Sequence, residues 1–291
     1  MWEDGSVTSS LFERLAQLDR LTDGEQTLAR YFENSYPKLA FQNLETVVQG
    51  SGVSATSVTR FVRRLGYSDF RDFSASVKDE VKANFDRPLQ RGRESVSSGP
   101  GTEMIQHFSR ARTEIEQTLD TFSAEQFDEV ADLLADESRP LFLVSVATGR
   151  TLLHYFYLLC KYHRGNVHML SGIDMNSHEL VDLTPDSVVF ATAFDRHPMP
   201  VEATLKLARS RGATTILVTN RATSPLRIYS DHVLLVQTDS TPRFKSRATM
   251  LLMLESLLAA MENRAPERTL SRTKLVEEGS DQLNMFIWPD Q

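Results

Sequence analysis

The sequence predicts two domains of different class: an all-α N-terminal domain, then an α/β domain of three-layer αβα type with a five-stranded parallel sheet. Three observations support this prediction. Up to about residue 85 the apolar residues recur at helical spacing. From residue 141 onward, five short apolar runs alternate with helical segments, which is typical of a parallel sheet covered on both faces. Between the two halves lies a stretch rich in Gly, Ser and Pro.

The domain boundaries are expected where these patterns change. The chain has 291 residues, which is enough for two separate cores. We expect a helical domain over residues 1–86, a linker over 87–102, an α/β domain over 103–264 and a tail over 265–291. The tail holds an apolar cluster, Met285-Phe-Ile-Trp288, which must either dock on a neighbouring surface or be exposed.

Each helix and strand is expected from its apolar period. The N-terminal helices are expected at Ser9–Arg20, Asp23–Ser35, Asn43–Gln49, Ala55–Leu65 and Asp69–Asn84. Two further helices, of which the second begins with a capping sequence, are expected at Glu103–Leu119 and Ser123–Leu134. The strands are expected at Leu141–Val146, Val167–Leu170, Ser187–Ala193, Thr214–Thr219 and His232–Gln237. A last apolar helix is expected from Ser246 to Met261.

Composition favours a cytoplasmic protein without a metal or cofactor. Cys160 is the single cysteine, so we expect an inert buried thiol and no disulfide or cysteine-based zinc cluster. The acidic N-terminus lacks the features of a signal peptide, and apolar runs such as Leu141–Val146 are too short to cross a bilayer. The histidines are scattered without metal-ligand spacing, among them His154, His163, His168 and His178.

Residues 43–66 have the layout of a helix-turn-helix, with a short helix, a turn containing Gly and a second helix. In the second helix Val58, Phe61, Val62 and Leu65 form a stripe that is expected to be buried. Ser54 is expected to cap this helix, Arg60 to reach a guanine, and the two arginines that follow to contact phosphates. The expected DNA-contacting residues are Ser54, Thr56, Ser57, Arg60, Arg63 and Arg64.

Charge gives two opposing indications about nucleic acid. The net charge of −7 argues against it, because Lys and Arg neutralise phosphates. Residues 44–71, however, carry four arginines against Glu45 and Asp69, so a basic segment lies within an acidic chain. One alternative is that these arginines form only a solvated helix face. A purely structural scaffold is a separate alternative, which we disfavour because it leaves the exposed arginines unexplained.

The segment Ser-Ala-Thr-Ser-Val-Thr-Arg-Phe-Val-Arg-Arg-Leu-Gly-Tyr-Ser-Asp-Phe, residues 54–70, resembles the signature of RpiR-family transcriptional regulators. The resemblance extends upstream through Leu21-Thr-Asp-Gly-Glu-Gln-Thr-Leu-Ala and downstream to about residue 263. It implies an N-terminal domain that binds double-stranded operator DNA and a C-terminal SIS (sugar isomerase) domain that binds a phosphosugar effector. It also implies a homodimer or homotetramer.

Two loops of the SIS-type domain are expected to bind the ligand. Each follows a strand, where backbone amides at a helix start favour anions. The residues expected to bind the ligand, including two just before the last helix, are Ser145, Thr148, Gly149, Arg150, Thr192, Asp195, Arg196, His197, Ser246 and Arg247.

Both loops depart from the family pattern. The Ser-rich stretch ending in Gly-x-Thr is replaced by a loop with Ala193, Asp195, Arg196 and Pro198, and the usual Gly-x-Gly by Ser145 and Ala147. A carboxylate repels phosphate, whereas Arg196 can compensate. Three outcomes stay open: a phosphosugar bound through Arg150 and Arg196, a different metabolite, or a pocket that serves only dimer packing. We favour an anionic metabolite.

A sugar-phosphate isomerase is the main alternative function. Such an enzyme needs a general base in the pocket. His197 and Glu202 are candidates by position, but we expect His197 in a solvent-facing loop and Glu202 on the outer face of the next helix. The sequence therefore predicts no catalytic residue.

Overall fold

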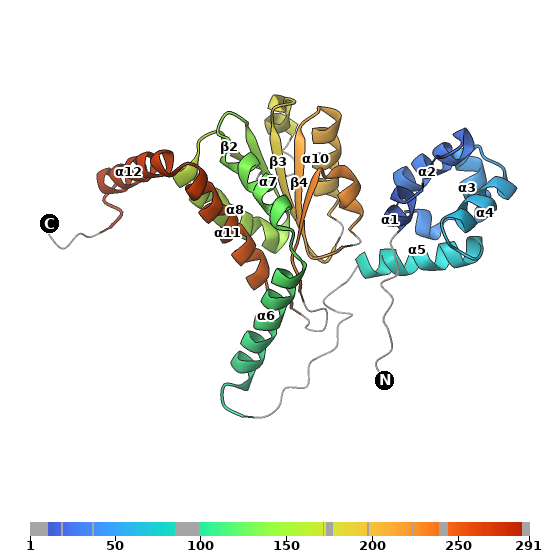
Figure 1. Cartoon of the computed structure of the whole chain (residues 1–291), viewed down its shortest axis with the longest axis horizontal. Helices are drawn as coiled ribbons and strands as arrows, with labels where there is room; N and C mark the ends of the chain where they lie inside the picture. The colour runs from blue at the N-terminus through green and yellow to red at the C-terminus, as the bar shows by residue number, and fades with distance from the viewer. Residues whose placement is uncertain are drawn as a thin grey trace. The chain divides into compact units, whose positions relative to one another are not determined.

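The computed structural model describes residues 11–18, 20–36, 38–84, 99–170, 172, 177–196, 198–222, 224–238 and 244–286. The chain divides into two compact units, residues 1–86 and 87–291 (Figure 1). Within the described ranges, no helix is long and apolar enough to span a bilayer.

The first unit consists of short helices around an aromatic core. Its elements are α1 (Leu11–Ala16), α2 (Asp23–Ser35), the 3-10 helix η1 (Lys38–Phe41), α3 (Leu44–Ser51), α4 (Ala55–Arg64) and α5 (Phe70–Asn84). The ring of Phe32 lies at the centre, 4.9 Å from that of Phe73 and 5.7 Å from that of Phe61. The expected helices are present, and η1 was not expected.

The second unit is built on a parallel sheet of order β2-β1-β3-β4-β5. The strands are β1 (Leu141–Val144), β2 (Val167–Met169), β3 (Val188–Ala193), β4 (Thr214–Thr219) and β5 (His232–Leu235). Because β1 lies between β2 and β3, the strand order reverses at β1, and the carboxyl ends of β1 and β3 lie side by side. The predicted three-layer fold with a five-stranded parallel sheet is confirmed.

Helices cover both faces of this sheet. The remaining elements are α6 (Thr102–Thr121), α7 (Ala124–Ala135), α8 (Ala147–His163), η3 (Leu180–Asp182), α10 (Met199–Ser210), η4 (Pro225–Tyr229), α11 (Ala248–Arg264) and α12 (Pro266–Gln282). Residues of α7, α8 and α11 share one core with the sheet. Residues of α10, η3 and η4 form the core on the other face.

Some boundaries of strands and helices differ from those expected from the sequence. The first strand ends at Val144, two residues early, because α8 already begins at Ala147, whose φ is 49°. Residues 87–98 of the expected linker lie outside the described residues, as does Trp288. The expected tail begins with α12, and Met285 and Phe286 beyond this helix are exposed.

Candidate functional site

The helix-turn-helix is formed by α3 and α4, and its ends are defined by local hydrogen bonds. The Asn43 side chain accepts from the backbone of Thr46 at the start of α3, and Gly52 ends this helix in the left-handed region with a φ of 70°. The Ser54 hydroxyl accepts from the Ser57 amide, which confirms the expected cap of α4.

The two faces of α4 are separated as predicted. Val58, Phe61, Val62 and Leu65 are all buried, which confirms the expected stripe. The other expected contact residues lie off this stripe: Ser54, Thr56, Arg60, Arg63 and Arg64 are exposed, and Ser57 is half-buried. Among the described residues Arg60 forms no hydrogen bond or ion pair, while Arg63 donates from Nε to the Ser68 carbonyl at 3.1 Å.

Arg64 is held within the domain by an ion pair. Its guanidinium lies 2.6 Å from the Glu25 carboxylate and also donates to the Arg20 carbonyl. Glu25 in turn accepts from the Thr22 backbone amide in a capping box at the start of α2. The hydrogen bonds from Thr22 and Arg64 lower the pKa of Glu25 from 4.5 to about 2. The ion pair between Arg64 and Glu25 therefore holds α4 against α2. Arg60 and Arg63, the other two arginines of α4, take no part in this ion pair.

In the second unit, Ser145 and Thr192 meet at the point where the strand order reverses. Thr192 donates from its hydroxyl to the Ser145 hydroxyl at 2.7 Å, and the Ser145 hydroxyl lies 3.2 Å from the Thr192 carbonyl. Gly149 on α8 packs directly over this pair, because a Cβ atom there would lie 2.5 Å from Ser145 Oγ. The structure therefore brings together these three residues, which the sequence assigned to two separate loops.

The start of α8 presents backbone amides without a side-chain cap. Val146 occupies the N-cap position and supplies no capping side chain. Thr148 in the first turn is exposed, and Arg150 is half-buried with Nε 3.4 Å from the Ser145 carbonyl. An uncapped helix start beside an arginine favours an anion.

Asp195 is buried within a cluster of opposite charges. Its carboxylate lies 2.8 Å from Lys245 Nζ and 2.8 Å from Arg247 Nη2. Asn220 at the end of β4 donates to the same carboxylate at 2.8 Å and to the hydroxyl of Thr238 at 2.6 Å. The cluster thus joins the loop after β3 to the ends of β4 and β5 and to the segment before α11.

The electrostatics of this cluster keep Asp195 ionised. Burial alone would raise the pKa of the carboxyl group, but hydrogen bonds from Lys245, Arg247 and Asn220 bring it well below its usual value. The Arg247 guanidinium also lies 5.1 Å from the centre of the Phe194 ring. One carboxylate therefore faces two cations, and the repulsion expected from an isolated carboxylate is offset.

The sequence did not indicate Lys245, Asn220 or Thr238 as members of this cluster. Lys245 directly precedes the two residues that were named before α11, and its side chain is only 4% exposed. The sequence signal that could have identified Lys245 is its position next to Ser246 and Arg247, just before an apolar helix. Asn220 and Thr238 follow the ends of β4 and β5, where side chains from parallel strands converge.

The remaining residues that the sequence placed in or near the ligand site take no part in the Asp195 cluster described above. Arg196 is exposed, and Ser246 accepts from the Ala248 amide at the start of α11. His197 lies outside the described residues. The expectation that Glu202 faces outward is wrong: it is buried, and its carboxylate lies 2.5 Å from Lys206. Among the described residues, no group of three His, Cys, Asp or Glu is placed to hold a metal.

Family comparisons match both units. The helix-turn-helix domain of the rpiR family matches residues 11–84, and the SIS domain matches residues 155–260. The chain is 27% identical over 218 residues to an uncharacterized HTH-type transcriptional regulator in the aarA 3' region of Providencia stuartii, covering 74% of each chain. It is 23% identical to an uncharacterized HTH-type transcriptional regulator of Thermotoga maritima, covering 88% of this chain and 94% of that one.

Solved structures show the same fold. The sugar isomerase domain of an RpiR transcription factor from Sphaerobacter thermophilus aligns with a TM-score of 0.56 and 21% identity, covering 60% of this chain and 98% of that one. NanR of Vibrio vulnificus, complexed with ManNAc-6P, aligns with a TM-score of 0.54 and 16% identity over 93% of this chain and 97% of that one. With both domains matched in this order, the chain belongs to the RpiR family of helix-turn-helix transcriptional regulators that carry a SIS domain.

Proposed function

We propose that this regulator binds double-stranded operator DNA through α4, and that the carboxyl ends of β1 and β3 bind a small anionic metabolite. One observation carries the DNA-binding part: α4 buries one face completely and exposes Arg60 and Arg63 on another. Because its apolar face is packed against the core of the first unit, α4 can enter the major groove with its other face. As a DNA-binding regulator, the protein is proposed to act in the cytoplasm.

The residues of α4 are proposed to have different roles. The start of the helix, with Ser54, Thr56 and Ser57, approaches the DNA backbone, where the helix amides favour a phosphate. Arg60 lies further along α4 and reads a guanine through O6 and N7, whereas Arg63 contacts a phosphate. Arg64 contributes by holding α4 against α2 through Glu25, so its role in binding is mainly to position the helix.

A selection of binding sites from random DNA tests these roles. The Arg60→Ala variant is expected to bind a broader set of sequences, because a base contact is lost. Arg63→Ala is expected to select the same sequences with uniformly weaker affinity. Unchanged selectivity in Arg60→Ala would remove its assigned role, and failure of the unaltered chain to enrich any DNA would contradict the proposed function.

The metabolite site is proposed around the start of α8. The amides at the start of α8 and the exposed hydroxyl of Thr148 supply donors there, Arg150 supplies positive charge, and Ser145, Gly149 and Thr192 form the packed floor beneath them. The structural likeness to NanR in its ManNAc-6P complex supports a phosphosugar or a related anion. Asp195 does not exclude an anion from the neighbouring loop, because Lys245 and Arg247 balance its charge.

A thermal-shift screen of phosphosugars and organic acids tests this site. A true effector at 100 times its dissociation constant is expected to stabilise the second unit by about 2.7 kcal/mol, a rise of several degrees in melting temperature. The effector should also change operator affinity, and Arg150→Ala should remove both responses. If no compound changes either quantity, the site serves packing alone. Turnover of any sugar phosphate would instead support the isomerase alternative.

A further inference from the structure

The Asp195 carboxylate is held in the way that proteins hold a bound anion. Three side chains donate to its two oxygens: Lys245 and Asn220 to Oδ1 and Arg247 to Oδ2, each at 2.8 Å. The Asp195 backbone amide also donates to Asn220 Oδ1 at 3.1 Å, so Asn220 contacts both the backbone and the carboxylate. Charge-assisted hydrogen bonds of this kind are the ones that proteins use to bind carboxylates and phosphates.

The donors and the carboxylate come from different segments of the chain. Asn220 follows β4, and Lys245 and Arg247 lie just before α11, whereas Asp195 lies in the loop after β3. These segments meet at the carboxyl edge of the parallel sheet, which is where ligands bind in folds of this kind. Donors at this edge are expected to face a ligand, but here they face a carboxylate of the same chain.

The backbone of Asp195 is held in an uncommon conformation. Its φ is 61°, in the left-handed region that few residues with a side chain adopt, although aspartate tolerates it better than most. Such a conformation persists where the contacts around the residue favour it. The contacts with Lys245, Arg247 and Asn220 therefore account for the position of the carboxylate better than local backbone preference does.

The Asp195 cluster retains positive charge and is accessible from one side. Its two cations and one carboxylate leave one positive charge in excess. Lys245 is only 4% exposed, but the side chain of Arg247 is 25% exposed. Nη1 of Arg247 is buried and, among the described residues, forms no hydrogen bond. The donors are thus not saturated by Asp195 alone.

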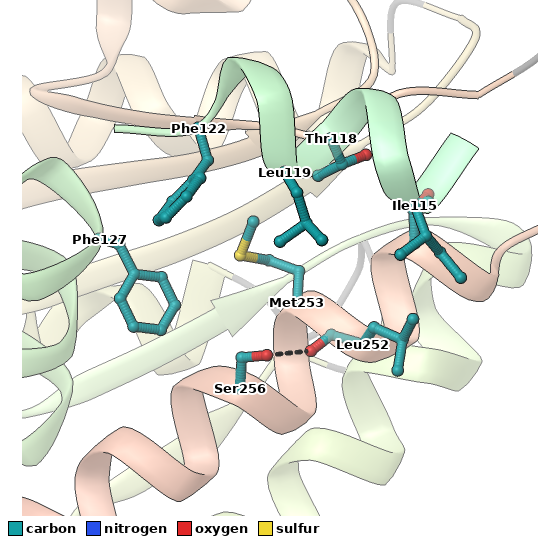
Figure 2. A pocket seen from close by; sticks show the side chains of 9 residues that line it. Ile115, Thr118, Leu119, Phe122, Phe127, Leu252, Met253 and Ser256 are labelled. Atoms are coloured by element: carbon teal, nitrogen blue, oxygen red, sulfur yellow. Dashed lines mark hydrogen bonds between the residues drawn. The ribbon is translucent and has the colours of Figure 1, made fainter. Parts of the chain in front are cut away.

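Figure 2 shows an apolar groove between α6, α7 and α11, which lacks this chemistry. Its volume is about 310 Å³, and Leu119, Leu252 and Met253 are among the apolar side chains that line it. The hydroxyls of Thr118 and Ser256 that face it already donate to carbonyls within the protein. Because no charged side chain of the described residues lines the groove, it offers an anion no counter-ion. Anion binding is therefore expected at the carboxyl edge of the sheet rather than in this groove.

We propose that Lys245, Arg247 and Asn220 form an anion-binding site that the chain fills with its own Asp195 carboxylate. Asp195 is then a specificity-determining residue, because a phosphate group of a ligand finds this site already occupied. The inference rests on the proposed function, for which it defines the class of effector.

The effector class that this arrangement favours is a carboxylate. With Lys245 and Arg247 engaged by Asp195, the start of α8 binds the effector through its backbone amides, the Thr148 hydroxyl and Arg150. One guanidinium balances one carboxylate and pairs with it through two parallel hydrogen bonds. A phosphate monoester carries nearly two negative charges at neutral pH and needs more cations. Arg196 is exposed to solvent, where an ion pair contributes little.

Replacing the carboxylate by a free anion tests the site. Asp195→Gly removes a side chain whose atoms beyond Cα match those of acetate, and glycine accepts the φ of 61°. In sodium chloride this variant of the full chain is expected to melt several degrees below the unaltered chain, because Lys245 and Arg247 lose this counter-ion. Sodium acetate or phosphate at the same ionic strength is expected to restore most of the loss, with a response that saturates.

Matched variants separate a bound anion from a general effect of salt. Asp195→Asn keeps the volume of the side chain, so it should lose stability without recovering in acetate. Asp231→Gly removes a carboxylate that accepts from the amide and hydroxyl of Thr215 and forms no ion pair among the described residues, so it should not recover either. Adding Lys245→Met to Asp195→Gly should raise the acetate concentration for half of the effect about 10-fold, because one cation is lost. The unaltered chain should respond little to acetate.

The effector class is measured separately. In the thermal-shift screen of the unaltered chain, carboxylates are expected to change both melting temperature and operator affinity, whereas phosphate monoesters change neither. Titration calorimetry with inorganic phosphate is expected to show binding at least about 10-fold tighter in Asp195→Gly than in the unaltered chain.

Three results would overturn the proposal. They are an Asp195→Gly variant that neither acetate nor phosphate stabilises, an equal recovery in Asp231→Gly, and a phosphate monoester that acts as effector of the unaltered chain. If Asp195→Gly is unfolded in chloride, recovery of its circular dichroism spectrum in acetate replaces the melting temperature, and no recovery also overturns the proposal.

These failures are distinguishable from failure of the proposed function. A chain that binds operator DNA and responds to a phosphosugar keeps the proposed function and loses only the role assigned to Asp195. Recovery of Asp195→Gly in acetate, in a chain that binds no DNA, contradicts only the DNA-binding role.

Discussion

Ser145 and Thr192 approach so closely that position 149 has no room for a side chain. Ser145 directly follows β1, Thr192 lies in β3, and Gly149 in the first turn of α8 packs against both hydroxyls. The hydroxyl of Ser145 fills the space that a Cβ atom of residue 149 would occupy. The glycine therefore allows α8 to start close to the sheet, where its amides are available to a ligand.

Gly149→Ala is expected to destabilise the second unit by about 1–3 kcal/mol, because the added methyl group overpacks a buried site. It should also break the bond between Ser145 and Thr192. Gly279→Ala is the control: Gly279 lies in α12 with nothing within 4 Å of its Cβ position. That variant should gain about 0.5–1 kcal/mol from helix propensity. Chemical denaturation measures both, and equal effects would contradict the steric argument.

Asp195→Asn tests whether the carboxylate compensates buried cations. Asp195 has a φ of 61°, which asparagine tolerates, so the change removes charge without straining the backbone. Lys245 is then left buried without this counter-ion, and the expected loss is about 3–5 kcal/mol. Hydrogen exchange in residues 188–196 and 244–250 measures it. Adding Lys245→Met should restore part of the loss, and no recovery would show that the pair is not coupled.

These residues show what sequence patterns reveal about a site. Ser145, Thr192 and Asp195 were predictable as residues at or just beyond the ends of apolar strands, where ligand-binding loops occur. Asn220 and Lys245 were not, because the cluster is assembled by loops far apart in the chain. Arg64 shows that sequence position can also suggest a surface role for a residue that the fold uses internally. Its position on α4 resembles that of Arg63, and only the fold brings Glu25 to it.

At the scale of elements, α2 and α4 are joined by the pair of Glu25 and Arg64. The Glu25 pKa is about 2 in the folded chain, against an ordinary value of 4.5. A lowered pKa means that the pair contributes its full stability above about pH 4.5 and loses it as the pH falls toward 2. Because the Arg64 side chain is 36% exposed, screening limits this contribution.

Glu25→Gln is therefore expected to destabilise the contact of α2 with α4 by about 1–2 kcal/mol at pH 7. The difference from the unaltered chain should shrink as the pH is lowered through 4.5. Hydrogen exchange in peptides from α2 and α4 reports this opening locally. Glu45→Gln, an exposed glutamate on α3, is the control and should have little effect. A pH-independent difference would mean that Glu25 acts only by packing.

Element prediction succeeded where one face of a helix is apolar and the other polar. Helix α4 is of this kind, and its buried stripe was predictable from spacing alone. Helix α6 was less informative, because its exposed apolar stripe has the same helical period as a buried one. The sequence therefore predicted the helix but not which apolar residues remain outside the core. The short η1 lacked any period long enough to detect.

At the scale of the whole molecule, the distribution of charge matters more than its sum. The chain has a net charge of −7, yet α4 exposes Arg60 and Arg63. Because salt screens charges beyond about 10 Å, acidic groups elsewhere weaken DNA binding less than their number suggests. The proposed DNA-binding surface is therefore expected to behave as a local basic patch.

The salt dependence of operator affinity distinguishes a local patch from overall charge. Arg63→Ala removes one proposed phosphate contact, so the slope of log affinity against log salt should decrease in magnitude by about 1. Lys274→Ala changes the net charge equally, but Lys274 is an exposed residue of α12 in the second unit. It should leave the slope unchanged. Equal changes in the two variants would mean that net charge, rather than the face of α4, governs association with DNA.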